Sequence, residues 1–215
     1  MSESSQTFSE RLNQLLARSG LELVSPDAAD SFAAYFALLL RWNARINLTA
    51  IRDEEGIVSR HFVESIACAR ALPAGIATLL DFGSGAGFPG IPIAICRPDI
   101  AVTLAESQGK KAAFLREAVR TLGLSTQVYS GRAESLNATF DCVTLRAVDR
   151  MPQATLAARR LVSPGGWLAV MTTTAQLEAL HSAFGEAVLW QTPAPLQGGA
   201  TRLLALAMVK MDSEL

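Results

Sequence analysis

A glycine-rich segment between an apolar stretch and a helical stretch limits the fold of this chain more than any other feature. Residues 81–87 read DFGSGAG, the apolar residues 78–80 precede them, and a helical pattern follows around Ile91. Glycine permits a tight turn and lets a ligand approach the backbone closely. A strand, such a turn and a helix together are typical of ligand-binding α/β folds, although three glycines alone also occur in ordinary turns.

After Pro73 the chain alternates β-prone runs with helical stretches. The expected strands cover residues 78–82, 101–105, 126–130, 141–145 and 167–171, and the expected helices cover residues 91–96, 110–122 and 152–161. This alternation predicts a doubly wound, mainly parallel sheet with helices on both faces. Two later runs, 187–190 and 203–209, are joined by a segment with two prolines and two glycines, which predicts a closing antiparallel hairpin.

The part of the chain before Pro73 has helical spacing throughout. Apolar positions at this spacing begin at Phe8, and Ser25-Pro26 resembles an N-cap followed by proline in the first helical position. Asp53 can cap a third helix that continues through Ile66. We therefore expect a helical region at residues 1–74 and an α/β domain at residues 75–212.

Composition narrows the class of protein further. The 215 residues are 50% hydrophobic and 18% charged, which favours a folded core over disorder. The apolar runs are too short to span a membrane, and residues 1–10 lack the features of a secretory signal, so we expect a cytoplasmic protein. The cysteines form no C-x-x-C pair, which predicts free thiols and no metal site; they are Cys68, Cys96 and Cys142.

The net charge of −1 argues mildly against binding to nucleic acid. The basic residues are nevertheless grouped, at positions 41–60, 110–120 and 146–160. Each group alone fits a solvated helix face as well as a binding surface. Together, the three groups can bind RNA phosphates.

Glu106 ends the second expected strand, about twenty residues after the glycine-rich segment, where dinucleotide folds place an acid that binds ribose hydroxyls. A helix-capping acid is the alternative. The glycine spacing differs from G-x-G-x-x-G and matches the D/E-x-G-x-G-x-G loop of class I methyltransferases, whose ligand has no pyrophosphate. The terminal hairpin also favours a methyltransferase over a dehydrogenase.

Residues 81–93, reading DFGSGAGFPGIPI, resemble the signature of the glucose-inhibited division B family, the bacterial 16S ribosomal RNA guanine-N7 methyltransferases. Further motifs follow in family order over most of the chain, and the resemblance is weak only at the two ends. These motifs are RWNARINLTAIR at 41–52, RHFVES at 60–65, ES and KK between 106 and 111, GRAE at 131–134, RAV at 146–148 and PGG at 164–166.

The resemblance implies an S-adenosylmethionine-dependent methyltransferase with a Rossmann-like fold, in which residues 75–212 bind the cofactor. It implies a monomer whose partner is 16S ribosomal RNA or the small ribosomal subunit. Arg132 and Arg146 are the implied substrate-holding, catalytic residues, with surface ion pairs as the alternative. The implied cofactor-binding residues are Asp81, Gly83, Ser84, Gly85, Gly87, Phe88, Glu106, Ser107, Ala133, Glu134 and Arg146.

The sequence departs from the family pattern after the fifth expected strand, where Thr172 and Thr173 replace the usual Lys-Gly pair. The substrate contact of that lysine is therefore missing, and we expect Lys110 or Lys111 to replace it. His61 lies among apolar helix positions and is expected to be a buried histidine with satisfied hydrogen bonds.

The implied reaction needs little from the protein's acid–base chemistry. Guanine N7 carries a free lone pair, so no proton must leave before it attacks a methyl group. Catalysis then consists mainly of alignment, and no general base is required. Three alternatives remain at this point: a nicotinamide-dependent oxidoreductase, a non-catalytic ribosome-binding factor that retains the cofactor fold, and a methyltransferase for small molecules.

Overall fold

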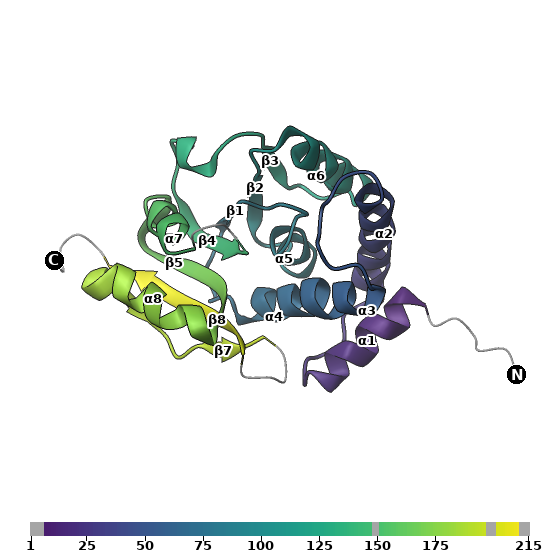
Figure 1. The fold of residues 1–215 in the computed structure, drawn as a ribbon, viewed down its shortest axis with the longest axis horizontal. Helices are drawn as coiled ribbons and strands as arrows, with labels where there is room; N and C mark the ends of the chain where they lie inside the picture. Colours follow the sequence, from purple (N-terminus) through teal and green to yellow (C-terminus); the bar gives the residue numbers. More distant parts are fainter. Residues whose placement is uncertain (1–6, 148–150, 197–200, 211–215) are drawn as a thin grey trace, which may run out of the picture.

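The computed structural model describes residues 7–147, 151–196 and 201–210, and an eight-stranded sheet forms its centre (Figure 1). Its parallel part confirms the expected strands and has the order β3 (Gln127–Tyr129), β2 (Ala101–Ala105), β1 (Thr78–Phe82), β4 (Phe140–Arg146) and β5 (Val162–Thr173). The expected closing hairpin is also present, because β8 (Arg202–Val209) runs antiparallel to β5 and pairs with β6 (Val188–Trp190) and β7 (Ala194–Pro195).

The order of the strands determines where a ligand can bind. The chain moves outward from β1 to β2 and β3, and then returns to the other side of β1 with β4. In open α/β sheets, ligands bind outside the carboxyl ends of the strands at this reversal of order. The glycine-rich segment follows β1 directly, and Arg146 ends β4, so both lie at that edge.

Side chains alternate between two hydrophobic clusters on the two faces of the sheet. One cluster lies beneath the N-terminal helices and also beneath α5 (Gly90–Cys96) and α6 (Gly109–Thr121). In β1, Leu79 belongs to this cluster, whereas Leu80 belongs to the cluster on the opposite face. That second cluster packs against α7 (Met151–Arg159) and α8 (Thr174–Phe184). The fold therefore has three layers, as expected for a doubly wound sheet.

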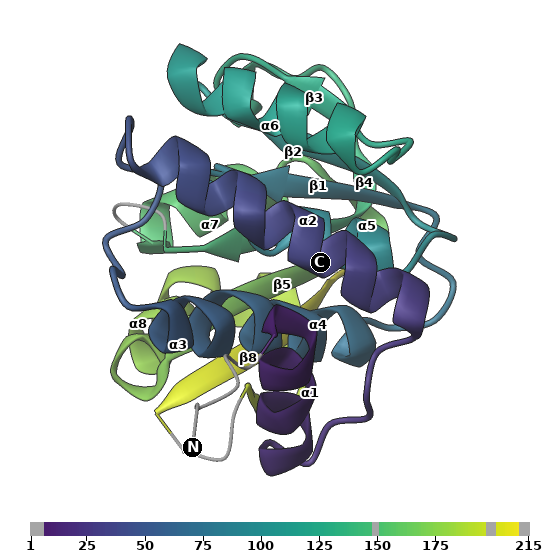
Figure 2. The same cartoon turned by 90° about the vertical axis from the view of Figure 1, so that its right-hand side faces the viewer.

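The N-terminal helices form a further cover over one face, and Figure 2 shows α2 (Pro26–Asn43) and α4 (Glu64–Ala71) lying in front of the sheet. The same region contains α1 (Phe8–Arg18) before α2, and α3 (Glu54–Ile57) after it. The π-helical turn η1 (Val58–Val63) follows α3 and leads directly into α4. Both expected N-caps are confirmed. The Ser25 hydroxyl accepts the Ala28 N–H at 3.3 Å, and the Asp53 carboxylate accepts the Gly56 N–H at 2.6 Å.

Polar and aromatic contacts attach this helical cover to the α/β part. The Glu117 carboxylate on α6 accepts hydrogen bonds from Trp42 Nε1 at 3.1 Å and Arg41 Nη2 at 2.7 Å. The ring of Phe62 lies 5.1 Å from that of Phe88, centroid to centroid. One hydrophobic cluster thus continues from the helices onto the sheet, and the division of the chain at residues 74 and 75 stays a prediction.

Two details differ from the expectation. Residues 164–166 do not form a turn before the fifth strand but lie inside β5, where the register with β4 shifts because Gly165 has a φ of +75°. Helix α8 was not expected, since threonines occupy its start and such residues are weak helix formers. Within the described residues, no helix is long and apolar enough to cross a membrane.

Candidate active site

Asp81 lies beneath the glycine-rich loop and binds α5 and β4 through its side chain. Its side chain is buried, with Oδ2 accepting the Gly90 N–H at 3.2 Å and Oδ1 accepting the Thr144 hydroxyl at 3.1 Å. Burial raises the pKa of Asp81 to about 6. Asp81 does not line the cavity and fixes the start of α5 beneath the loop, so its predicted contact with the cofactor stays a prediction.

The glycines of the loop serve different purposes. Gly83, Gly85 and Gly87 all have positive φ, at 72°, 56° and 89°. A Cβ atom on Gly85 would have only the Gly83 carbonyl nearby, at 3.9 Å, whereas one on Gly87 would lie 2.5 Å from Ile91 Cδ1 and 2.8 Å from the Tyr35 hydroxyl. Gly85 therefore leaves room for a ligand, and Gly87 leaves room for the protein's own core.

Glu106 connects the end of β2 to the loop. Its Oε2 accepts the Gly85 N–H at 2.9 Å, and its Oε1 accepts the Gln108 N–H at 2.7 Å. A carboxylate offers about four lone-pair sites, so hydroxyl donors can still bind it. Glu106 thus caps the following turn and also lines the cavity, and its contact with ribose hydroxyls stays a prediction.

A cavity of about 760 Å³ lies at this edge of the sheet, and three parts of the chain form its walls. The first wall contains Gly83, Ser84, Gly85, Phe88, Glu106 and Ser107. The second wall comes from the helical cover and contains Leu48, Thr49, Ile51, Arg60, His61 and Glu64. The third wall comes from the ends of β4 and β5 and the start of β8, and it contains Arg146, Ala147, Thr172, Thr173 and Arg202.

A smaller cavity of about 300 Å³ shares Gly83 and Ser107 with the large one. Its lining includes Arg132, Ala133 and Glu134, which the sequence predicted as site residues. Arg132 and Arg146 therefore line different cavities, and their substrate-holding roles stay predictions.

The two cavities share part of their lining, and together they offer room for an extended ligand. Gly85 has open space above it, and Glu106, which accepts the Gly85 N–H, lines the larger cavity. The volume of the larger cavity falls within the range of ligand sites, roughly 300–1,000 Å³. Among the described residues, no group of three or more His, Cys, Asp or Glu side chains is arranged to hold a metal ion.

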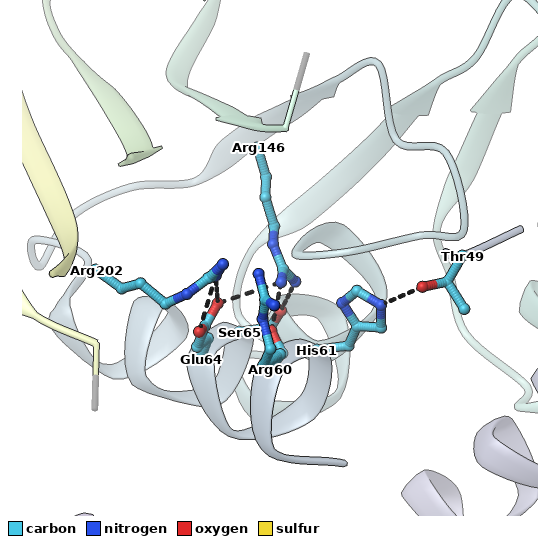
Figure 3. A network of polar contacts seen from close by, with 7 residues as sticks. All are labelled: Thr49, Arg60, His61, Glu64, Ser65, Arg146 and Arg202. Atoms are coloured by element: carbon cyan, nitrogen blue, oxygen red, sulfur yellow. Dashed lines mark hydrogen bonds and ion pairs between the residues drawn. The ribbon is translucent and has the colours of Figure 1, made fainter. Parts of the chain in front are cut away.

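Three arginines of the cavity lining lie together around Glu64 (Figure 3); they are Arg60, Arg146 and Arg202. Arg146 donates to Glu64 Oε2 at 3.2 Å and to the carbonyl of Arg60. Arg202 donates to both oxygens of Glu64 at 3.1 Å. Burial raises the pKa of Glu64 to about 7, although the charges of Arg146 and Arg60 act to lower it.

His61 is placed differently from the expectation. Its Nε2 lies 2.6 Å from the Thr49 hydroxyl and its ring stacks on Phe88, but Nδ1 has no hydrogen-bond partner in the described part of the chain. The prediction of a fully satisfied histidine was therefore wrong. Burial, together with the charges of Arg146 and Arg60, lowers the pKa of His61 to about 3, so the ring is neutral at pH 7.

The basic groups seen in the sequence divide between the cavity and the surface. Lys111 lines the cavity and Lys110 does not, which favours Lys111 as the replacement for the missing lysine. Arg41 is bound to Glu117, and Arg116 donates to the Ser130 hydroxyl. Residues 148–150, which include Val148 and Arg150, lie outside the described residues.

Sequence reasoning gave no role to three residues that shape the site. Tyr35 donates a hydrogen bond to the Ala86 carbonyl in the loop, and Glu64 and Arg202 form the ion-pair network. Glu64 lies within the RHFVES motif, but nothing local indicated that it meets two arginines from distant strands. Such contacts depend on packing between elements, which spacing alone does not reveal.

The sheet order, the glycine-rich loop and the acid after β2 define a class I methyltransferase. The O-methyltransferase from Bacillus cereus, solved in complex with SAH, shares the fold with a TM-score of 0.61 at 16% identity, covering 93% of this chain and 97% of that one. A cofactor-bound protein from MTB gives a TM-score of 0.63 at 20% identity, covering 93% and 96%. At such identities, the likeness concerns the fold alone.

Sequence similarity defines the family more narrowly. Residues 28–190 match the GidB family, described as rRNA small subunit methyltransferase G, and this chain belongs to that family. The ribosomal RNA small subunit methyltransferase G of Xanthomonas euvesicatoria pv. vesicatoria (strain 85-10) is 47% identical over 71% of this chain and 73% of its own length. The protein of that name from Neisseria meningitidis (strain Z2491) is 42% identical over 75% and 78%.

Proposed function

We propose that this chain transfers the methyl group of S-adenosylmethionine to N7 of a guanine in 16S ribosomal RNA. One observation carries the proposal: a single cavity joins a glycine-rich wall with a buried acid, suited to the cofactor, to a wall of arginines, suited to RNA. The names of the relatives point to small-subunit ribosomal RNA, and the resemblance in the sequence points to guanine N7.

The residues of the glycine-rich wall would hold the cofactor. The Gly85 region would face its amino-acid end, and the Glu106 carboxylate would accept from the ribose hydroxyls. Ala133 and Glu134 line the smaller cavity, where adenine would lie, and Arg132 lines it with them. The cofactor supplies an already activated methyl group, so the hard chemistry is its own.

The protein's own contribution is alignment. Guanine N7 needs no base to attack a methyl group. Arg146 cannot serve as one, because a guanidinium stays protonated in proteins. His61 is neutral and is held by Thr49, so it can shape the cavity without exchanging protons. Alignment of two reactants in a closed site gives effective molarities up to roughly 10⁵–10⁸ M.

RNA recognition would rely on the arginine-rich wall. Arg60, Arg146 and Arg202 outnumber the Glu64 carboxylate that they surround, which leaves this wall positively charged. Arginine matches phosphate and guanine O6 with a planar fork that lysine lacks. The proposed activity requires the cytoplasm, where ribosomes are present, and action as a monomer stays a prediction.

A transfer assay tests the proposal. Purified protein and S-adenosylmethionine with a labelled methyl group are incubated with 16S ribosomal RNA, with small subunits and with 23S ribosomal RNA as a matched control. Nucleosides from each reaction are then separated by chromatography. We expect labelled 7-methylguanosine from the small-subunit substrates only. Label in another nucleoside, or transfer to a small molecule without RNA, would contradict the proposal.

A further inference from the structure

Glu64 lies where three separate parts of the chain meet beside the cavity. It is the first residue of α4, while Arg146 ends β4 and Arg202 begins β8. Its side chain is only 1% exposed, although it is a carboxylate. In Figure 3 the two guanidinium groups reach Glu64 from their different strands, next to the π-helical turn that carries Arg60.

The hydrogen bonds give both arginines a definite direction. Arg146 is held by Glu64, by the Arg60 carbonyl and, at 3.5 Å, by the Ser65 hydroxyl, and its side chain is 10% exposed. Arg202 is 31% exposed, and within the described residues its side chain bonds only to Glu64. Its Nη1 is used, so Nη2 and Nε remain as donors for a ligand.

Stability does not account for this arrangement. Ionic groups lose their hydration on burial, so a buried ion pair adds little net stability, and apolar side chains of similar volume often serve as well or better. What the carboxylate provides is geometry, because it binds two planar guanidinium groups in fixed orientations at the edge of the cavity. A pair of oriented guanidinium groups is suited to a phosphate, which accepts charge-assisted hydrogen bonds from both.

We propose that Glu64 is a positioning residue that holds Arg146 and Arg202 together as one binding unit for an RNA phosphate beside the target base. This proposal rests on the function proposed above and adds a role for a residue that touches neither the methyl group nor the base. Glu64 acts through the two arginines. Its removal should therefore impair RNA methylation and leave cofactor binding unchanged.

The substitution Glu64→Gln tests this role with little change in shape. The amide keeps one acceptor oxygen but has no charge, and its NH₂ group takes the place of one of the two oxygens that accept from Arg202 Nη1. Arg202 therefore loses one of its two bonds and meets a donor instead, and both arginines lose the charge assistance of the carboxylate. We expect single-turnover methylation of 16S ribosomal RNA to slow by between about 10- and 100-fold. Calorimetry should give unchanged affinity for S-adenosylmethionine. A wild-type methylation rate in Glu64→Gln would overturn the proposal.

Glu54→Gln is the matched control, since Glu54 lies two elements earlier in the same helical run and pairs with Arg11 at 2.9 Å outside the cavity. It should methylate RNA normally.

The double variant Glu64→Gln/Arg202→Gln should be no slower than the slower single variant, because both changes disrupt the same unit. Additive losses would show that the two residues act separately and would contradict the proposal.

Two further measurements keep the result interpretable. If Glu64→Gln does not fold, the variants Arg202→Gln and Arg202→Lys test the proposal instead. The proposal predicts slow methylation of RNA by Arg202→Gln and a partly recovered rate in Arg202→Lys. Full activity in both variants would overturn the proposal. Side-chain NMR with ¹⁵N-labelled arginine needs no activity. The Nη–H signals of Arg146 and Arg202, whose Nη atoms donate to Glu64, should be protected in the wild type and lose protection in Glu64→Gln. Unchanged NMR signals in Glu64→Gln would refute the positioning role of Glu64, whatever the substrate is. Failure of the proposed function is distinguishable, because the wild type would then not methylate 16S ribosomal RNA.

Discussion

The hydroxyl of Tyr35 on α2 donates a hydrogen bond to the backbone carbonyl of Ala86 in the glycine-rich loop. Tyr35 is fully buried, and its ring lies against Phe62 and Phe88. The helical cover is therefore bound directly to the segment that would hold the cofactor. Its contribution to the site is not limited to shielding one face of the sheet.

Tyr35→Phe should weaken the binding of S-adenosylmethionine, because the Ala86 carbonyl loses its donor and the loop becomes less well held. An unsatisfied buried acceptor costs about 1–3 kcal/mol. Calorimetry measures the affinity, and Trp42→Phe on the same helix is the control, since it removes a single donor to Glu117 away from the loop. Equal affinities in Tyr35→Phe and the wild type would show that the bond serves folding alone.

Gly85→Ala and Gly87→Ala should have different effects although both glycines have positive φ. A methyl group at Gly85 enters open space, so that variant should fold, with a strain of about 1–2 kcal/mol, and lose cofactor affinity. A methyl group at Gly87 meets Ile91 and Tyr35, so that variant should lose stability. Thermal unfolding measures the stability of each variant, and calorimetry measures its affinity for the cofactor. If Gly85→Ala binds the cofactor as tightly as the wild type, Gly85 does not contact the cofactor.

Glu106→Gln should abolish discrimination between ribose and deoxyribose in the ligand. The carboxylate can accept from two hydroxyls, each charge-assisted bond contributing about 1.5–3 kcal/mol. We expect the wild type to bind S-adenosylhomocysteine more tightly than its 2′-deoxy analogue, and the variant to bind both with similar, weaker affinity. If the wild type binds the two ligands equally, Glu106 holds only the loop and the turn at Gln108.

Arg146→Lys should slow RNA methylation and leave cofactor affinity nearly unchanged. Lysine keeps the charge but cannot reach Glu64, Ser65 and the Arg60 carbonyl with a planar fork. A misplacement of roughly 1 Å costs about 10²-fold in rate. Single-turnover methylation beside calorimetry measures both quantities, and a normal rate in Arg146→Lys would show that orientation by the guanidinium is not needed.

The stability of the wild type should fall with decreasing pH because of His61. The folded-state pKa of His61 is about 3, below its ordinary value of 6.5, so the unfolded chain binds a proton in this window and the folded chain does not. The free energy of unfolding should decrease by up to about 1.4 kcal/mol per pH unit as the pH falls from 6.5 towards 3. Denaturant unfolding of the wild type and His61→Gln isolates this dependence. Parallel pH profiles for the two proteins would contradict it.

Local patterns predicted much of the fold. Ser25 and Asp53 cap helices as expected, and β1 and β2 have the expected bounds, because caps and buried parallel strands depend on adjacent residues. Residues 164–166 were misassigned because Gly165 turns the chain without ending β5. Register between strands is set by tertiary pairing, which is not encoded in any short segment.

The site was predictable where its residues are near one another in sequence. Gly85 and Glu106 are placed as the loop pattern and the strand end indicated. Asp81 and Gly87 belong to the same motif, yet their contacts are to the protein's core, which the pattern does not distinguish from ligand contacts. The contact of Tyr35 with Ala86 spans 51 positions and requires the folded structure.

The central claim concerns the modified atom and its RNA, and mapping 7-methylguanine in ribosomal RNA tests it most directly. Ribosomal RNA is isolated from cells with and without this protein, treated so that the chain breaks at 7-methylguanine, and read by primer extension. The account predicts one guanine of 16S ribosomal RNA that is modified only when the protein is present, and that is restored by the wild type but poorly by Arg146→Lys. Identical modification of 16S ribosomal RNA in both kinds of cell would contradict it.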